Sequence, residues 1–205
     1  LYGGSIEGCK VVSERTSYHG GGVQVSGHQA VFHMYGGAIR NCANYVGDSS
    51  GGQGGGVYVS SGTFNLYGGT IENCTTRNDS VQGSTGGYGG GVCVNDNGVF
   101  NMEGGTIQGC YAYEGGGVCV YGTANLKDGT IRNNTAEYGG GVGVFGQLNM
   151  SGGTITDCKA AQRADGINME HGDFQMTGGT VTKCIGDKLA LYVDFDASYT
   201  KTGGI

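Results

Sequence analysis

The chain has 205 residues, including 47 glycines and no proline, and its formal net charge is −6. Glycine without proline and without a Gly-X-Y period excludes a collagen-like or low-complexity chain. The acidic balance argues against a nucleic-acid partner, because phosphates require a Lys/Arg stripe. No run of about 18 apolar residues is present, so the sequence predicts no membrane span.

Three short apolar motifs recur from the first residues to the last. Gly-Gly-Thr-Ile, with small variations, places an apolar residue at Ile6, Ile39, Ile71, Ile107, Ile131, Ile155 and Val181. Gly-Val-x-Val recurs, with looser later copies, at residues 23–25, 57–59, 92–94, 118–120, 142–144, 167–169 and 191–193. The motif x-Phe-Asn-Met recurs, also with variations, at 32–34, 64–66, 100–102, 124–126, 148–150 and 174–176. Apolar residues two positions apart are typical of strands, and repetition every 20–50 residues or so is typical of a solenoid.

This spacing predicts the architecture. Three short strands per repeat, each alternating inward and outward, fit one coil of a β-solenoid. We therefore expect an all-β protein, a right-handed single-stranded parallel β-helix of about seven coils with three short strands per coil. Apolar spacing of two excludes a helical repeat, and a propeller blade of about 40 residues exceeds the shortest coil. Because both chain ends fall within repeats, residues 1–205 are expected to form one domain cut from a longer protein.

The motifs Gly-Gly-Thr-Ile-x-x-Asn/Cys, Gly-Gly-Gly-Val-x-Val and Phe-Asn-Met-x-Gly-Gly resemble the right-handed β-helix repeats of large adhesin-like bacterial surface proteins, which are common among gut Firmicutes. They are more distantly similar to chlamydial polymorphic outer-membrane proteins, whose Gly-Gly-Ala-Ile is matched once, at residues 36–39, and whose Phe-x-x-Asn is absent. The resemblance covers nearly the whole chain and implies an extracellular protein, secreted or at the cell surface. It says little about function, because such coils serve adhesins, lyases and tailspikes alike.

Six of the eight cysteines share one repeat position, three residues after the apolar residue of Gly-Gly-Thr-Ile, and Asn134 fills that position in the remaining repeat. They are Cys9, Cys42, Cys74, Cys110, Cys158 and Cys184. Stacked coils place them in a column with neighbours about 4.8 Å apart. The column is either a file of buried free thiols or a set of disulfides between coils. The simplest disulfide set is Cys9–Cys42, Cys74–Cys110 and Cys158–Cys184. No zinc or iron–sulfur site is expected, since a linear column does not converge four thiolates.

The other two cysteines occupy a different position. Cys93 and Cys119 lie between the two valines of consecutive Val-x-Val motifs. Side chains alternate along a strand, so we expect both thiols to face outward, side by side on the surface. A structural surface disulfide is expected there rather than a redox pair.

The outward positions indicate no catalytic residue. The middle of Val-x-Val carries no carboxylate, and we find no acidic cluster beside an Arg or Lys, so neither a glycosidase pair nor a lyase acid–base set is predicted. Asp194 and Asp196 lack a partner column, and the histidines are scattered over different coils, so we predict no metal site and no cofactor. An outward column predicts an amide ladder along the axis, formed by His33, Asn65, Asn101, Asn125, Asn149 and Gln175.

Three long connections follow the cysteine column in the first three coils, at residues 10–19, 43–53 and 75–88. They leave from the same corner, so we expect them to gather along one edge, where solenoids often bind ligands. The candidate ligand-binding residues on this edge are Tyr18, His19, Tyr45, Asp48, Arg77, Asp79, Tyr88, Tyr113, Glu114 and Tyr138. Tyrosine combines an apolar ring with a polar tip, which suits sugars or protein partners. Solvated loops on a stiff scaffold are the equally weighted alternative.

Three functions fit this sequence. The first is an adhesin-like binding module that recognises a host or dietary glycan or a host protein. The second is a segment of a carbohydrate-active enzyme, of the polysaccharide lyase or hydrolase type, with its catalytic groups in the loops. The third is a purely structural surface stalk.

Overall fold

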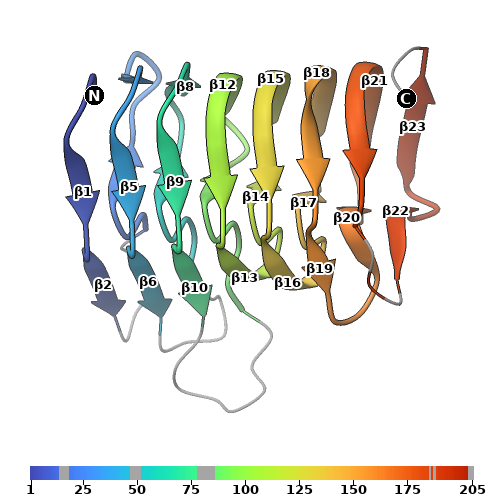
Figure 1. Cartoon of the computed structure of the whole chain (residues 1–205), viewed down its shortest axis with the longest axis horizontal. Helices are drawn as coiled ribbons and strands as arrows, with labels where there is room; N and C mark the ends of the chain where they lie inside the picture. Colours follow the sequence, from blue (N-terminus) through green and yellow to red (C-terminus); the bar gives the residue numbers. More distant parts are fainter. Residues whose placement is uncertain (14–18, 47–51, 78–85, 185, 187, 203–205) are drawn as a thin grey trace.

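The computed structural model describes residues 1–13, 19–46, 52–77, 86–184, 186 and 188–202. In this part of the chain all regular structure is β-strand, arranged in three sheets of parallel strands (Figure 1). Neighbouring strands in each sheet come from successive repeats, so the chain advances coil by coil from one end to the other. The protein is a parallel β-helix, as the motif spacing predicts.

Sheet A collects the strands of two motifs, x-Phe-Asn-Met and Gly-Gly-Thr-Ile. Its strands are β1 (Ser5–Glu7), β4 (Val31–Met34), β5 (Ala38–Arg40), β8 (Thr63–Leu66), β9 (Thr70–Glu72), β12 (Val99–Gln108), β15 (Thr123–Arg132), β18 (Gln147–Thr156), β21 (Gly172–Thr182) and β23 (Ala197–Lys201). The two motifs form separate strands in the early coils. In later coils they join into single strands, each with a register irregularity at the glycines between the motifs.

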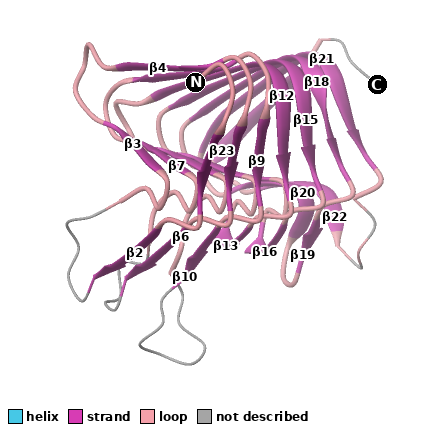
Figure 2. Ribbon diagram, turned by 60° about the vertical axis from the view of Figure 1, so that its left-hand side comes forward, coloured by secondary structure: helices cyan, strands magenta, loops and turns pink. Residues whose placement is uncertain are grey.

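Sheet C is formed by the Val-x-Val motif. Its strands are β3 (Val23–Val25), β7 (Val57–Val59), β11 (Val92–Val94), β14 (Val118–Val120), β17 (Val142–Val144), β20 (Ala164–Met169) and β22 (Leu189–Val193). Both valines of β11 lie opposite their counterparts in β7 and β14, which confirms the predicted stacking. Figure 2 shows sheet C between the strands of sheets A and B.

Sheet B was not predicted, because its residues read as connections. Its strands are β2 (Lys10–Ser13), β6 (Ala43–Val46), β10 (Thr75–Arg77), β13 (Tyr111–Glu114), β16 (Thr135–Tyr138) and β19 (Lys159–Ala160). The inward side chains here are small or polar, such as Asn44, Thr76 and Ala112, all buried. Strands with so little apolar content give no alternating hydrophobic signal.

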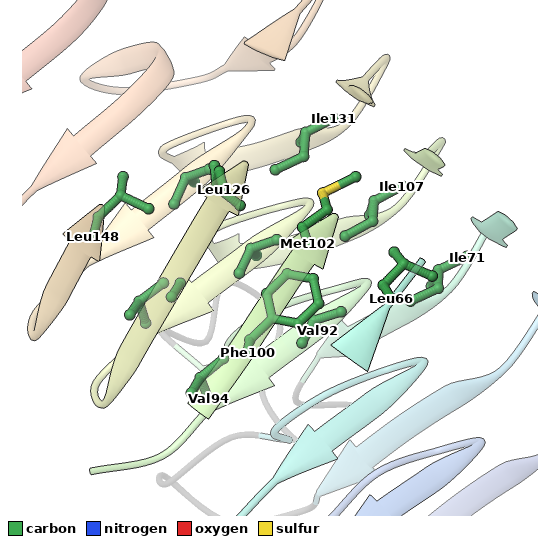
Figure 3. Packing of buried hydrophobic residues seen from close by; sticks show 14 of the residues in the cluster. Leu66, Ile71, Val92, Val94, Phe100, Met102, Ile107, Leu126, Ile131 and Leu148 are labelled. Atoms are coloured by element: carbon green, nitrogen blue, oxygen red, sulfur yellow. The ribbon is translucent and has the colours of Figure 1, made fainter. Parts of the chain in front are cut away.

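The inward residues of sheets A and C form one continuous core (Figure 3). Its largest members stack on their own counterparts: the rings of Phe64 and Phe100 lie 5.2 Å apart between centroids. Leu66, Met102 and Ile107 are likewise buried beside them. A single coil has no second layer to cover these side chains, so stability comes from neighbouring coils.

Each corner between sheets A and B has a residue in the left-handed backbone region. Glycine takes this role at Gly8 and Gly109, and elsewhere a side chain is accommodated, as at Asn73 with φ 53°. Asparagine tolerates this region better than most residues, because its short polar side chain bonds locally. The residue after this turn is the column residue, a cysteine or Asn134, and it is buried in every coil except the first.

In the described part of the chain, no helix is long and apolar enough to cross a membrane.

Candidate functional site

The predicted binding edge lies where sheet B passes into sheet C. Of its ten candidate residues, Tyr18, Asp48 and Asp79 lie outside the described residues. Backbone pairing between successive coils places Tyr88, Glu114 and Tyr138 in one row, each directly before a glycine triplet. Arg163 holds the same sequence position in the next repeat, before Ala164-Asp165-Gly166. We call this set of residues, with His19, the pre-glycine row.

Tyr45 and Arg77 lie on neighbouring strands of sheet B, in register. The Tyr45 ring is held between two cations, with the Lys10 ammonium 4.2 Å and the Arg77 guanidinium 4.9 Å from its centroid. The Tyr45 ring is therefore already engaged in cation–π contacts within the protein. A ligand here would compete with them.

The outward column of sheet C forms the floor beside the pre-glycine row. It runs through Tyr58, Cys93, Cys119, Gly143, Asn168 and Tyr192. His19 packs against Tyr58, with ring centroids 4.6 Å apart. This floor and its flanking residues divide into an aromatic half and a polar half.

The aromatic half corrects the prediction for Cys93 and Cys119. Both thiols point outward from the coil, as expected, but both are 0% exposed rather than on the surface. Tyr88, Tyr121 and Phe145 pack over them, and the last two rings stack with centroids 4.6 Å apart. The rings that bury the two thiols come from other repeat positions, so the alternation of side chains along the strand could not predict this burial.

The predicted disulfides are also wrong. All eight cysteines are free and no pair lies at disulfide distance, neither Cys93–Cys119 nor the pairs predicted within the column. Five of the six column thiols, all but Cys184, lie instead near the carbonyl oxygen two residues earlier in the chain; Cys74 Sγ, for example, lies 3.3 Å from the Glu72 oxygen. Asn134 takes the same position with two bonds, accepting from the Cys110 amide at 2.9 Å and donating to the Ile107 carbonyl at 3.1 Å. The free-thiol alternative is thus correct for the column, and its thiols are buried except for Cys9 in the first coil.

Native protein is expected to react with iodoacetamide at Cys9 alone. Cys9 is exposed, whereas the other seven thiols are buried. A hydrogen bond to the Cys110 thiol, together with burial, raises the pKa of Cys74 to about 12, so its reactive thiolate is scarce at neutral pH. Mass spectrometry should give one adduct on native protein and eight after unfolding. Rapid native labelling of several cysteines, or fewer than eight adducts on unfolded protein before reduction, would contradict this arrangement.

The polar half of the floor begins at Gly143, where the side chain of Glu114 lies over the backbone of β17. A Cβ atom at Gly143 would lie 2.4 Å from Glu114 Oε1, so only glycine leaves room for the carboxyl group. Asn168 Nδ2 donates to Glu114 Oε1 at 3.1 Å and lies 3.4 Å from Glu170 Oε1. One amide nitrogen thereby links two carboxyl groups.

The two carboxyl groups differ in environment. Glu114 is 3% exposed. Burial raises its pKa to about 8, and Glu170 adds to the rise, while the Asn168 bond and the charge of Arg163 oppose it. Glu114 is therefore predominantly protonated at neutral pH. Glu170, by contrast, is partly exposed and pairs with Arg163.

Arg163 organises the rest of this half. It bonds to Glu170, and its guanidinium lies 3.6 Å from the Asp194 carboxylate. Its charged plane also lies 5.4 Å from the Tyr138 ring centroid and 4.9 Å from that of Tyr192. Tyr138 in turn meets Tyr113 edge to face, with centroids 5.3 Å apart. Two tyrosines and two carboxylates are thus fixed around one cation.

This cluster was not predicted from the sequence, and the expectation that no acidic cluster lies beside an Arg or Lys is wrong. Asp194 was not expected to have a partner because its own column offers none, and its partner Arg163 belongs to a different column. Glu170 and Asp194 follow the Val-x-Val motif in consecutive coils, while Glu114 and Arg163 precede the glycines. The sequence signal that could have predicted the cluster is the constant spacing of both positions, the one after Val-x-Val and the one before the glycines, from their motifs.

Fold and site together define a parallel β-helix whose sheet C carries an aromatic and a charged cluster on its outer face. No family model matches the chain, and no curated protein or solved structure matches it either.

Proposed function

We propose that this chain is an adhesin-like binding module of a cell-surface or secreted protein and that it binds glycan along the edge between sheets B and C. One observation carries the proposal. Half-exposed tyrosines from successive coils, Tyr88, Tyr113 and Tyr138, are gathered on this edge beside amide and carboxyl groups. Aromatic rings with polar tips suit sugars, and the stiff coils hold them in place before binding.

A protein ligand is the alternative partner on the same edge. A carbohydrate-active enzyme is the second candidate function, and the Glu114–Asn168–Glu170 arrangement favours it. Glycosidases pair a neutral with an ionised carboxyl group. The burial of Glu114 weighs against it, because a general acid must reach its substrate.

Immobilised glycans and a turnover assay distinguish these functions. We expect retention on at least one glycan without release of reducing sugar or of unsaturated products. Replacing Tyr113 by alanine should weaken retention about tenfold through loss of ring contact, while Tyr2→Ala, on a different surface, should leave it unchanged. Turnover that disappears in Glu170→Gln would favour the enzyme. Binding to neither glycan nor protein would favour the stalk.

A further inference from the structure

The polar half of sheet C presents two partly exposed carboxylates, Glu170 and Asp194. Glu170 Oε1 faces Arg163 and the Asn168 amide nitrogen. Asp194 Oδ2 faces Arg163 and the Tyr192 hydroxyl, and Asp194 Oδ1 accepts from the Phe195 amide. Asn168 adds a further acceptor: its Oδ1 atom is buried and has no hydrogen-bond partner among the described residues. Because this atom is buried, the acceptors within reach of a ligand are the carboxylate oxygens, which suit a ligand that donates hydrogen bonds.

Charge narrows the class of ligand. Two carboxylates outnumber the one guanidinium, and an uncharged Glu114 does not alter this balance. An anionic ligand would meet net repulsion, and Arg163 has both carboxylates as partners already. A cationic ligand would have to displace Arg163 or approach it closely. A neutral ligand rich in hydroxyl donors meets neither obstacle.

The accessible surface of the cluster also has a defined shape. Tyr138 and Tyr192 are both partly buried, and each ring lies near the Arg163 guanidinium. Glu170 and Asp194 remain partly exposed beside the same guanidinium. Glu114, which is nearly inaccessible, supports Asn168 from beneath and is a positioning residue.

From these features we infer that Tyr138, Tyr192, Glu170 and Asp194 form a subsite for a neutral saccharide, with Arg163 and Asn168 holding them in place. The carboxylates accept from neighbouring sugar hydroxyls, and the tyrosine rings contact the apolar faces of the sugar. Uronic acid polymers are excluded by charge. This inference rests on the proposed function and specifies its ligand class and location.

Native affinity electrophoresis tests it, with gels containing soluble β-glucan, xylan, galactomannan or polygalacturonate. We expect retardation by at least one neutral polysaccharide and none by polygalacturonate. Tyr192→Ala and Asp194→Asn should each weaken that binding at least tenfold. Asn is nearly isosteric with Asp and removes charge and acceptor strength without removing bulk. Tyr2→Ala and Asp96→Asn, both far along the chain from this cluster, serve as matched controls, and thermal melts confirm that all variants are folded.

The outcomes separate this inference from the broader function. Retardation that Tyr192→Ala and Asp194→Asn leave unchanged, but that Tyr113→Ala weakens, would overturn the subsite and preserve glycan binding on the edge. Retardation by polygalacturonate alone would overturn the neutral ligand class. Retardation by no polysaccharide would overturn both proposals.

Discussion

Glu114→Gln should make the protein more stable than the wild type at alkaline pH by about 2–4 kcal/mol. The folded pKa of Glu114 is about 8, above its ordinary value of 4.5, so the folded state holds a proton that the unfolded state releases. The favourable contribution of this proton is fully present below pH 4.5 and is lost as pH rises to about 8. Glutamine stays neutral and can still accept a hydrogen bond from Asn168, so the Glu114→Gln variant does not lose this stability as the pH rises.

Urea unfolding between pH 4 and 9 measures the effect. The difference between wild type and Glu114→Gln should be small at the acid end and grow steadily until about pH 8. Glu103→Gln is the matched control, because Glu103 is exposed and pairs with Lys127 on the surface; its effect should stay below about 1 kcal/mol. Parallel stability curves for wild type and Glu114→Gln would show that Glu114 is not buried as a neutral acid.

Gly116→Ala should destabilise the protein by more than about 3 kcal/mol and disrupt the middle coils. A Cβ atom at this position would lie 2.3 Å from the Thr135 carbonyl oxygen and 2.6 Å from that of Gly140. Both obstacles are backbone atoms of the following coil, which cannot rotate away as the end of a side chain could. The middle glycine of the other triplets faces equally close backbone, as at Gly55 and Gly90.

Gly3→Ala provides the control for this experiment, since no atom lies within 4 Å of a Cβ there. It should change stability by no more than about 0.5 kcal/mol. Thermal melts followed by circular dichroism compare the two variants. A Gly116→Ala protein as stable as Gly3→Ala would mean that the triplet does not pack directly on sheet B.

The fold could be predicted from the sequence because its core positions repeat with a period of two within strands and recur in every coil. The register of Ile71, Ile107 and Ile131 was readable directly from the Gly-Gly-Thr-Ile motif. The amide ladder was predicted for the same reason, and hydrogen bonds link its members from His33 to Asn149, as between Asn101 and Asn125 at 2.8 Å. Sheet B escaped prediction because its inward residues are alanine, threonine and asparagine, which give no apolar signal.

The candidate site was harder to predict, since it depends on contacts between columns. Alternation correctly turned Cys119 away from the core but could not show that Tyr121 and Phe145 fold back over it. Glu114 and Asn168 are separated by 54 residues, and their bond exists because Gly143 leaves a gap on the intervening strand. An absent side chain leaves little trace in a sequence where glycine is abundant.

The amide ladder of sheet A has a direction. Asn101 donates to Asn65, Asn125 to Asn101 and Asn149 to Asn125, so every bond runs from the later coil to the earlier one. The two neighbours of each coil are therefore chemically distinct. The asparagine of a coil donates a hydrogen bond to the preceding coil and accepts one from the following coil. Aligned amide dipoles add along the file, which makes the long axis of the molecule a vector at the level of its side chains as well as its backbone.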